Sequence, residues 1–195
     1  MRIVGSSAID VVREVIARVV VNGRDVENFR ELVGIVMEIR DCRYNHDLHR
    51  AIKEFPQTTT ARKFMKTMLF FDELPQSSRV RKYLQLVVKK LEEKEETKKA
   101  CIPVIVSEDL GKEYMPSLAF VQILVREKKV RVFATFRSLD LVSGGLWNIL
   151  GLERIAEQIS TNINSHHLPD IIVFVISAHV QHKDFTLVDK IVRKR

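Results

Sequence analysis

The sequence contains little cysteine and no long apolar segment, and each absence excludes a class of protein. Its two cysteines, Cys42 and Cys101, cannot form a disulfide framework, and neither belongs to a CxxC or Cys/His cluster. No apolar run reaches the roughly 18 residues that a membrane span needs, and the N-terminus does not have the pattern of a signal peptide. We therefore expect a cytoplasmic protein without a membrane partner, in which Cys101 is a buried structural thiol.

Common catalytic and metal-binding motifs are also absent. The sequence has no GxGxxG, P-loop, GxSxG or HExxH motif, and its histidines lack the neighbouring cysteines or carboxylates of a metal site. Paired carboxylates such as Glu92 and Glu93 are expected on an exposed helix, where nothing tunes them for acid–base chemistry. No repeat or linker interrupts the chain, so we predict a single domain over residues 1–195 that holds no metal.

The composition and the charge are those of a soluble globular protein with an excess of basic residues. Apolar residues make up 46% and charged residues 29% of the chain, and the formal net charge is +7. This excess favours an anionic partner, but it fits nucleic acid, a phosphorylated small molecule or a simple solubility charge. Part of it lies in residues 190–195, which we predict to be a frayed basic tail.

Helical and strand-like segments are mixed along the chain, which predicts an α/β or α+β domain. Segments with helical spacing lie at 7–23, 60–73, 78–96 and 144–159, and Ser7 with Asp10 has the spacing of a capping box. Strand-like segments lie at 32–39, 101–106, 118–126, 130–136 and 170–176. The last of these is apolar enough to predict a strand buried on both faces. Residues 40–57 are expected to form a loop with one short helix.

A group of polar residues lies in the otherwise apolar C-terminal half. Arg137 and Ser138 are expected directly after a strand, and a forked guanidinium beside a hydroxyl suits phosphate recognition. Gly144 and Gly145 precede a helix, where backbone can approach a ligand closely. Asn148 follows one turn later with an amide that can read a pyrimidine edge. Taken singly, each of these residues also suits a helix cap, a turn or an ordinary surface position.

In combination, these segments resemble the thymidylate synthase family over residues 5–182, most closely its short archaeal-type branch. Residues 137–148 resemble the family's R-S-x-D-x-x-x-G-x-x-x-N segment, and 116–122 resemble its nucleophile strand, P-C-x-x-x-x-Q. Three other segments are similar: 177–179 resembles the family's H-x-Y, 55–60 resembles its F-P-x-x-T-T, and Glu73-Leu74 matches the end of the helix that follows. Residues 97–100 lie where the family has an Arg-Arg pair.

The resemblance implies a mixed β-sheet flanked by α-helices, a homodimer packed through its sheet faces, and a pocket for a pyrimidine deoxynucleotide such as dUMP. The residues to which it assigns the nucleotide are Arg24, Lys98, Lys99, Gln122, Arg137, Ser138, Asp140, Asn148 and His179.

The implied roles divide along the nucleotide. The phosphate is assigned to Arg137 and Ser138, to Lys98 and Lys99 of the partner subunit, and to Arg24 of the early loop. The uracil ring is assigned to Asn148, with support from the Asp140 backbone. His179 is expected near the ribose hydroxyl, and Gln122 is expected to order the nucleophile strand.

The chain also departs from the family at positions that carry its chemistry. Ser117 occupies the position of the nucleophilic cysteine, and an alcohol needs an adjacent strong base, which neither sequence neighbour provides. Gln181 replaces the tyrosine of H-x-Y, and the lysine pair lacks the bidentate geometry of arginine. Part of the family's middle region, near its folate site, is missing between Leu74 and Tyr83, and its folate-closing tail is not recognisable.

Three functions fit this pattern. The first is a nucleotide-binding protein that has lost methyl transfer, and we take it as the working hypothesis. The second is an active thymidylate synthase or related C5 pyrimidine methyl or hydroxymethyl transferase, with methylenetetrahydrofolate as cofactor, in which Ser117 or another group attacks. The third is a basic platform for nucleic acid or for a protein partner, although the aromatic–basic interleaving of RNA-stacking surfaces is absent.

Overall fold

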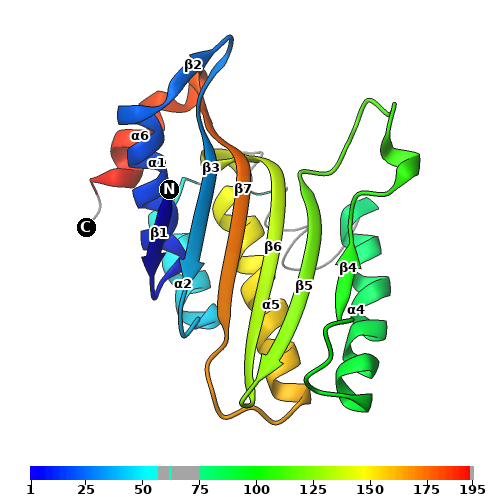
Figure 1. The fold of residues 1–195 in the computed structure, drawn as a ribbon. Helices are drawn as coiled ribbons and strands as arrows, with labels where there is room; N and C mark the ends of the chain where they lie inside the picture. The colour runs from blue at the N-terminus through cyan, green and yellow to red at the C-terminus, as the bar shows by residue number, and fades with distance from the viewer. Residues whose placement is uncertain (57–61, 63–74, 194–195) are drawn as a thin grey trace.

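A seven-stranded mixed sheet forms the centre of the molecule (Figure 1). The computed structural model describes residues 1–56, 62 and 75–193. The strands are β1 (Arg2–Gly5), β2 (Arg24–Val26), β3 (Phe29–Ile39), β4 (Cys101–Pro103), β5 (Leu118–Arg126), β6 (Lys129–Asp140) and β7 (Asp170–Gln181). Their order is β1-β3-β7-β6-β5-β4, with β2 paired to β3; β1–β3 and β6–β7 are parallel, and the other pairs are antiparallel.

Five α-helices of the described residues cover one face of this sheet. They are α1 (Ala8–Asn22), α2 (Tyr44–Glu54), α4 (Pro75–Glu93), α5 (Leu146–Asn162) and α6 (Phe185–Val192). In Figure 1 they lie behind the strands, and the face toward the viewer carries no helix of the described part. We call this second face the open face. The mixed α/β class is confirmed. The helices that flank the sheet in the described part of the chain all lie on one of its faces.

The first helix has the predicted extent, but its cap is different from the predicted one. Ser7 makes no side-chain cap bond to the helix, and Asp10 is exposed. Instead, Asp47 of α2 accepts hydrogen bonds from the Ala8 N–H at 2.7 Å and from Ser7 Oγ at 3.0 Å. A carboxylate from another element therefore satisfies the first helical N–H, which local spacing could not predict.

Strands β6 and β7 are longer than predicted, whereas β5 has the predicted bounds and β4 is shorter than the predicted strand at 101–106. A two-residue turn at Glu127 and Lys128, both with positive φ, joins β5 to β6 and confirms the predicted hairpin. Arg137 and Ser138, expected to follow a strand, lie inside β6 because that strand continues to pair with β7. The prediction that β7 is buried on both faces is wrong, since Phe174 is 42% exposed on the open face.

Four further predictions can be compared with the structure. Cys101 is exposed and Cys42 is the buried thiol, so the expected burial of Cys101 is wrong. Helix α6 extends into the segment predicted to fray, and its Ile191 is fully buried. The predicted helix at 60–73 lies outside the described residues, apart from position 62. Among the helices that the structure describes, none combines the length and the apolar character needed to cross a membrane.

In three central strands, the alternation of buried and exposed side chains shifts by one residue at the same level of the sheet. In β6 the buried positions are even-numbered up to Phe136 and then continue at Leu139, and β7 shifts in the same way between Val175 and Ala178. In β3, Gly34 has a φ of 72° at the matching level, and the paired ladders skip it together with Arg137. Such irregularities place two consecutive side chains on one face. Arg137 and Ser138 thus both lie on the open face.

Candidate functional site

The candidate site lies at the upper end of the open face, where β6 and β7 end and β5 begins in Figure 1. Ser138 is paired with Ser177 across β6 and β7, and Asp140 is paired with His179. Glu31 of β3 lies opposite His179 on the other side. Directly opposed residues of neighbouring strands share a face, so these side chains form one polar group.

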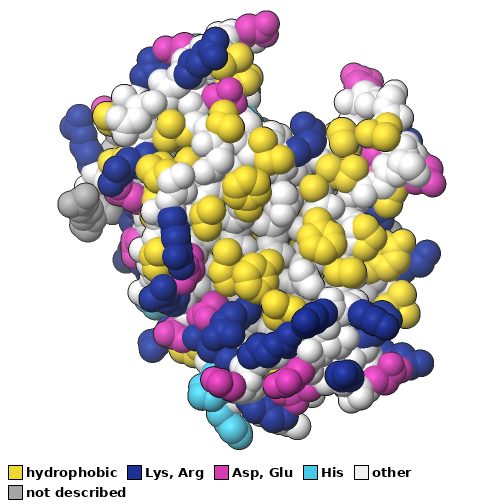
Figure 2. Space-filling model, viewed as in Figure 1, with side chains coloured by type: hydrophobic (Ala, Val, Ile, Leu, Met, Phe, Trp, Pro, Cys, Tyr) yellow, Lys and Arg dark blue, Asp and Glu magenta, His cyan; other side chains and the backbone are white. Residues whose placement is uncertain are grey.

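The surface above this polar group is hollowed. Figure 2 shows a notch between the β2–β3 hairpin and the β4–β5 connection, residues 104–117. Hydrophobic side chains gather below the notch, across the middle of the open face. A polar group therefore lies above an apolar surface, an arrangement that suits a ligand with one charged and one flat end.

Arg137 is fixed at the edge of this notch by backbone carbonyl groups. Its Nε donates to the Pro116 carbonyl at 2.9 Å, and its Nη2 donates to the Met115 carbonyl at 2.7 Å. The side chain is exposed, and no carboxylate of the described residues lies within 4.0 Å of it. Because a guanidinium carries five N–H donors, this cation is held in place while it keeps donors for an anion.

Ser117 lies directly beside Arg137. The Arg137 N–H donates to the Ser117 carbonyl at 2.9 Å, and the Ser117 side chain is half-buried before β5. No described side chain hydrogen-bonds to Ser117 Oγ, so the structure shows no base that could remove its proton.

Tyr114 is a neighbour of Arg137 that the sequence patterns did not indicate. Its side chain is half-exposed on the β4–β5 connection. Burial of the hydroxyl raises the pKa of Tyr114, and the positive charge of Arg137 opposes that rise. The phenol therefore lies close enough to the guanidinium for the positive charge to lower the pKa of Tyr114.

Asp140 has a structural role as well as its place in the polar group. Its Oδ1 accepts hydrogen bonds from the N–H groups of Val142 at 3.2 Å and Ser143 at 3.1 Å. These bonds cap a π-helical turn, η2 (Leu141–Gly145), which leads into α5. Nearby Asp184 is buried with one unpartnered oxygen among the described residues, and burial together with Asp140 raises its pKa. Sequence reasoning missed Asp184, because nothing local indicates its burial.

Asn148 and the glycine turn lie deeper than expected. Asn148 is 4% exposed, and its Nδ2 donates to the Gly144 carbonyl at 2.8 Å. All residues from 141 to 150 are buried, and a Cβ at Gly145 would lie 3.2 Å from the Asp140 carbonyl oxygen. The turn therefore packs tightly inside the protein, and the expectation that its backbone faces a ligand is wrong.

His179 combines a fixed ring with a polar atom that has no partner. Its ring packs on Phe29 with centroids 5.0 Å apart. Its Nδ1 is buried and has no hydrogen-bond partner among the described residues. Buried polar atoms of this kind are rare in folded proteins and require an explanation.

The remaining predicted residues lie away from this group. Gln122 is paired with Cys101 and donates to the Lys98 carbonyl at 3.0 Å, so it lies about 16 Å along β5 from Ser117. Lys98 and Lys99 line a separate pocket of about 460 Å³ at the end of α4, with Lys90, Glu93, Lys94, Glu96 and Thr97.

Arg24 lies closer to the polar group than the lysine pair does. It is exposed on β2, opposite Glu31, and so is two strands away from His179. The structure thus brings together five of the predicted residues: Ser117, Arg137, Ser138, Asp140 and His179. It separates Lys98, Lys99 and Gln122 from them.

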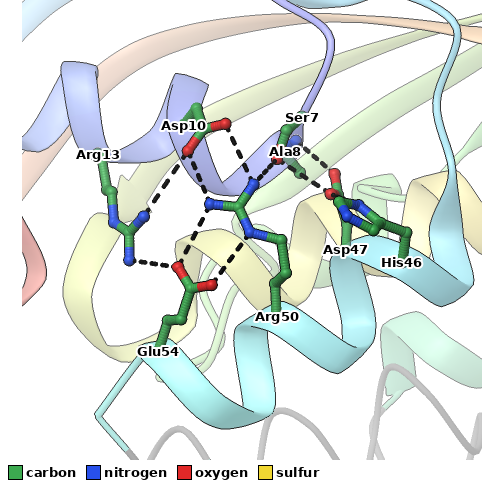
Figure 3. A network of polar contacts seen from close by, with 8 residues as sticks. All are labelled: Ser7, Ala8, Asp10, Arg13, His46, Asp47, Arg50 and Glu54. Atoms are coloured by element: carbon green, nitrogen blue, oxygen red, sulfur yellow. Dashed lines mark hydrogen bonds and ion pairs between the residues drawn. The ribbon is translucent and has the colours of Figure 1, made fainter. Parts of the chain in front are cut away.

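A second polar group joins α1 to α2, and Figure 3 shows its residues. Arg50 donates to Asp10 at 3.1 Å and to Glu54 at 3.1 Å, and Arg13 donates to Glu54 at 2.8 Å. We call this group, together with the Asp47 cap, the α1–α2 network. A pocket of about 420 Å³ adjoins it, lined by Asp10, Arg13, Glu14, Ala17, Arg50 and Val192.

A buried carboxyl group lies behind this network. Glu153 of α5 is fully buried, and neither of its oxygens has a hydrogen-bond partner among the described residues. Burial raises the pKa of Glu153 to about 9, and the negative charge of Asp47 adds to this shift. Burial likewise raises the pKa of the Cys42 thiol far above its usual value. Both groups are therefore neutral at physiological pH.

No group of three or more potential metal ligands occurs within the described residues.

Comparison with known proteins identifies no family for this chain. A scan of protein-family models gave no match to the chain, and a search of curated proteins gave no relative. The function must therefore be inferred from the site itself.

Proposed function

We propose that this protein binds a pyrimidine deoxynucleotide such as dUMP on a thymidylate synthase-like sheet, without the methyl transfer of that family. The observation that carries the proposal is that the Arg137 guanidinium is held in a fixed position without a carboxylate partner among the described residues. Two backbone carbonyls hold its guanidinium at the notch, and the described residues supply no carboxylate to neutralise it. A phosphate would provide the missing negative charge.

The neighbouring strands are spaced to receive the rest of a nucleotide. Strands in a sheet lie about 4.8 Å apart, so Ser138 on β6 and His179 on β7 are separated by one strand spacing and a short rise along the sheet. With the phosphate at Arg137 and Ser138, the sugar would lie beside His179. Asn148 is buried beneath the Gly144 turn and donates to the Gly144 carbonyl, so a contact between Asn148 and the ring is not part of this proposal.

The lack of methyl transfer follows from Ser117. A serine hydroxyl attacks pyrimidine carbon only when a base removes its proton, and the described side chains place no base on its Oγ. Methylenetetrahydrofolate is therefore a cofactor only under the alternative in which the protein is an active transferase.

A second copy of the chain is the proposed partner for the open face. Exposed apolar side chains on it are Phe120 at 38%, Phe174 at 42% and Ile176 at 46%. Figure 2 shows a hydrophobic area across the middle of this face, bordered below by lysine and arginine side chains. Extended apolar patches are uncommon on monomers. Lys98 and Lys99 lie far from their own Arg137, so only a partner's pair would complete the phosphate site.

The dimer can be tested by replacing an apolar side chain at its centre. Phe174→Lys should convert the dimer to a monomer in sedimentation equilibrium, because a buried, unpaired ammonium is costly. Leu86→Lys on α4 is the control, since Leu86 is 52% exposed outside the open face. A monomeric wild-type protein would contradict this part of the proposal.

Nucleotide binding can be tested by calorimetry with dUMP. Arg137→Ala should weaken binding at least tenfold, because each charge-assisted hydrogen bond contributes about 1.5–3 kcal/mol. The matched control is Arg126→Ala at the far end of β5, where the guanidinium also donates to a carbonyl, that of Val125. An equal affinity in wild type and Arg137→Ala would contradict the proposed site.

The chemistry can be tested with dUMP that carries tritium at carbon 5. We expect no tritium release with or without methylenetetrahydrofolate, because addition to carbon 6 must precede release and Ser117 is not activated. Ser117→Cys provides the companion variant with the missing thiol. Tritium release by the wild-type protein would favour the transferase alternative.

A further inference from the structure

Glu31 lies in the polar group, although no sequence motif drew attention to it. It is paired with Arg24 on one side and with His179 on the other, and its side chain is half-buried. Ser177, two residues before His179 on β7, shares that face because alternate residues of a strand point the same way. Glu31 is therefore oriented toward the space beside His179.

The Glu31 carboxylate is held by a hydroxyl and is not neutralised by a cation. Its Oε2 accepts a hydrogen bond from Ser177 Oγ at 2.5 Å. Among the described residues, no lysine, arginine or histidine lies within ion-pair distance of it. A carboxylate offers about four acceptor positions, so most of its accepting capacity remains unused. Since it can only accept, the ligand group that meets it must be a donor.

Glu31 and Arg137 lie at opposite ends of the polar group. Glu31 on β3 is level with Asp140 of β6, three residues beyond Arg137, so the two positions are separated by about 10 Å across the sheet and about 10 Å along it, or roughly 14 Å between backbones. The negative charge of Glu31 repels a phosphate, whereas Arg137 attracts one. The two side chains together therefore fix the direction in which a nucleotide can bind.

From this juxtaposition we infer that Glu31 recognises the sugar of the bound nucleotide by accepting a hydrogen bond from its 3′-hydroxyl. The inference rests on the proposed nucleotide site and adds a residue that determines which nucleotides the site accepts. His179, whose Nδ1 has no partner among the described residues, lies beside the same hydroxyl. Ser177 keeps the carboxylate in position through its hydroxyl.

The test compares two ligands that differ only in this hydroxyl. The full chain is titrated by calorimetry with dUMP and with 2′,3′-dideoxyuridine monophosphate. Wild type should bind dUMP about tenfold more tightly, because a hydrogen bond to a charged group is lost with the analogue. Glu31→Gln should reduce this preference at least threefold while leaving the affinity for the analogue unchanged. Glu27→Gln, an exposed residue of the same hairpin, is the matched control and should bind like wild type.

The outcomes separate this inference from the proposal on which it rests. If wild type binds both ligands equally, or if Glu31→Gln weakens both to the same extent, Glu31 does not read the 3′-hydroxyl, although the nucleotide site stands. If wild type binds neither ligand, the nucleotide site itself is wrong and the role of Glu31 is lost with it.

Discussion

The two polar groups of this protein differ in how their charges are balanced. In the α1–α2 network each guanidinium has a carboxylate, as Arg13 and Arg50 do with Glu54. Asp10 and Glu54 raise the pKa of Arg50, and Arg50 in turn lowers the pKa of Glu54. At the upper end of the open face, Arg137 has no carboxylate within the described residues, and His179 Nδ1 has no hydrogen-bond partner there.

We take this difference to separate structural polar residues from the residues proposed to bind a ligand. Charges that neutralise one another tie helices together and leave nothing for a guest molecule. A guanidinium that is fixed without a counter-charge keeps N–H donors that an anionic ligand can use. The comparison predicts that mutations in the first group change stability, whereas mutations in the second change binding.

The largest expected effect concerns Glu153, which lies against the α1–α2 network without a compensating partner. Its pKa is about 9 in the folded protein, above the ordinary value of 4.5. The folded state therefore binds the proton more tightly than the unfolded state, so stability falls as pH rises from about 4.5 to about 9. Between pH 6 and pH 8 the loss should be at most about 3 kcal/mol.

Glu153→Gln removes this titration and should give a nearly flat profile of unfolding free energy against pH, measured in urea. At pH 8 the variant should be more stable than wild type, because a neutral amide replaces an acid that resists ionisation. Glu157→Gln, an exposed residue of the same helix, should retain the wild-type slope. A variant that is no more stable at pH 8 than wild type would refute the neutral buried acid.

Arg50→Ala should have the next largest effect. It removes one of the two cations that Asp10 and Glu54 share, and exposed Asp10 and part-buried Glu54 then have only Arg13 between them. We expect a loss of about 2 kcal/mol in the free energy of unfolding and no change in dUMP affinity. Arg18→Ala is the control, since Arg18 forms an exposed pair with Glu14 that contributes little. A reduction of dUMP affinity in Arg50→Ala would contradict the prediction that mutations in the α1–α2 network change stability and not binding.

Arg137→Ala should show the reverse pattern with the smallest change in stability. Its guanidinium is exposed and donates to two carbonyls that water can also satisfy. The free energy of unfolding should change by less than about 1 kcal/mol, while dUMP binding weakens at least tenfold. If the variant is destabilised as strongly as Arg50→Ala, Arg137 is a structural residue.

Much of the fold could be predicted from local sequence patterns. Helix α1 and strands β5 and β6 follow from the spacing of apolar residues, and the short turn at 127–128 marks their hairpin. The end of β6 was missed because Arg137 and Ser138 are polar, and only pairing with β7 shows that the strand continues through them.

The candidate site depended more strongly on contacts that are distant in sequence. The grouping of Arg137, Ser138 and His179 was expected from the resemblance, and the strand register brings these residues together. Glu31 and Tyr114 could not be predicted, because their positions follow from strand pairing and from a loop without a pattern. The Asp47 cap of α1 was missed for the same reason, since the two elements meet only in the folded chain.

The most direct test is a crystal structure of the full chain soaked with dUMP. We expect the phosphate within hydrogen-bond distance of the Arg137 guanidinium and the Ser138 hydroxyl, with the sugar beside His179. A nucleotide found elsewhere, such as in the pocket lined by Lys98 and Lys99 of the same chain, or a notch that stays free of nucleotide at saturating dUMP, would contradict the proposed site.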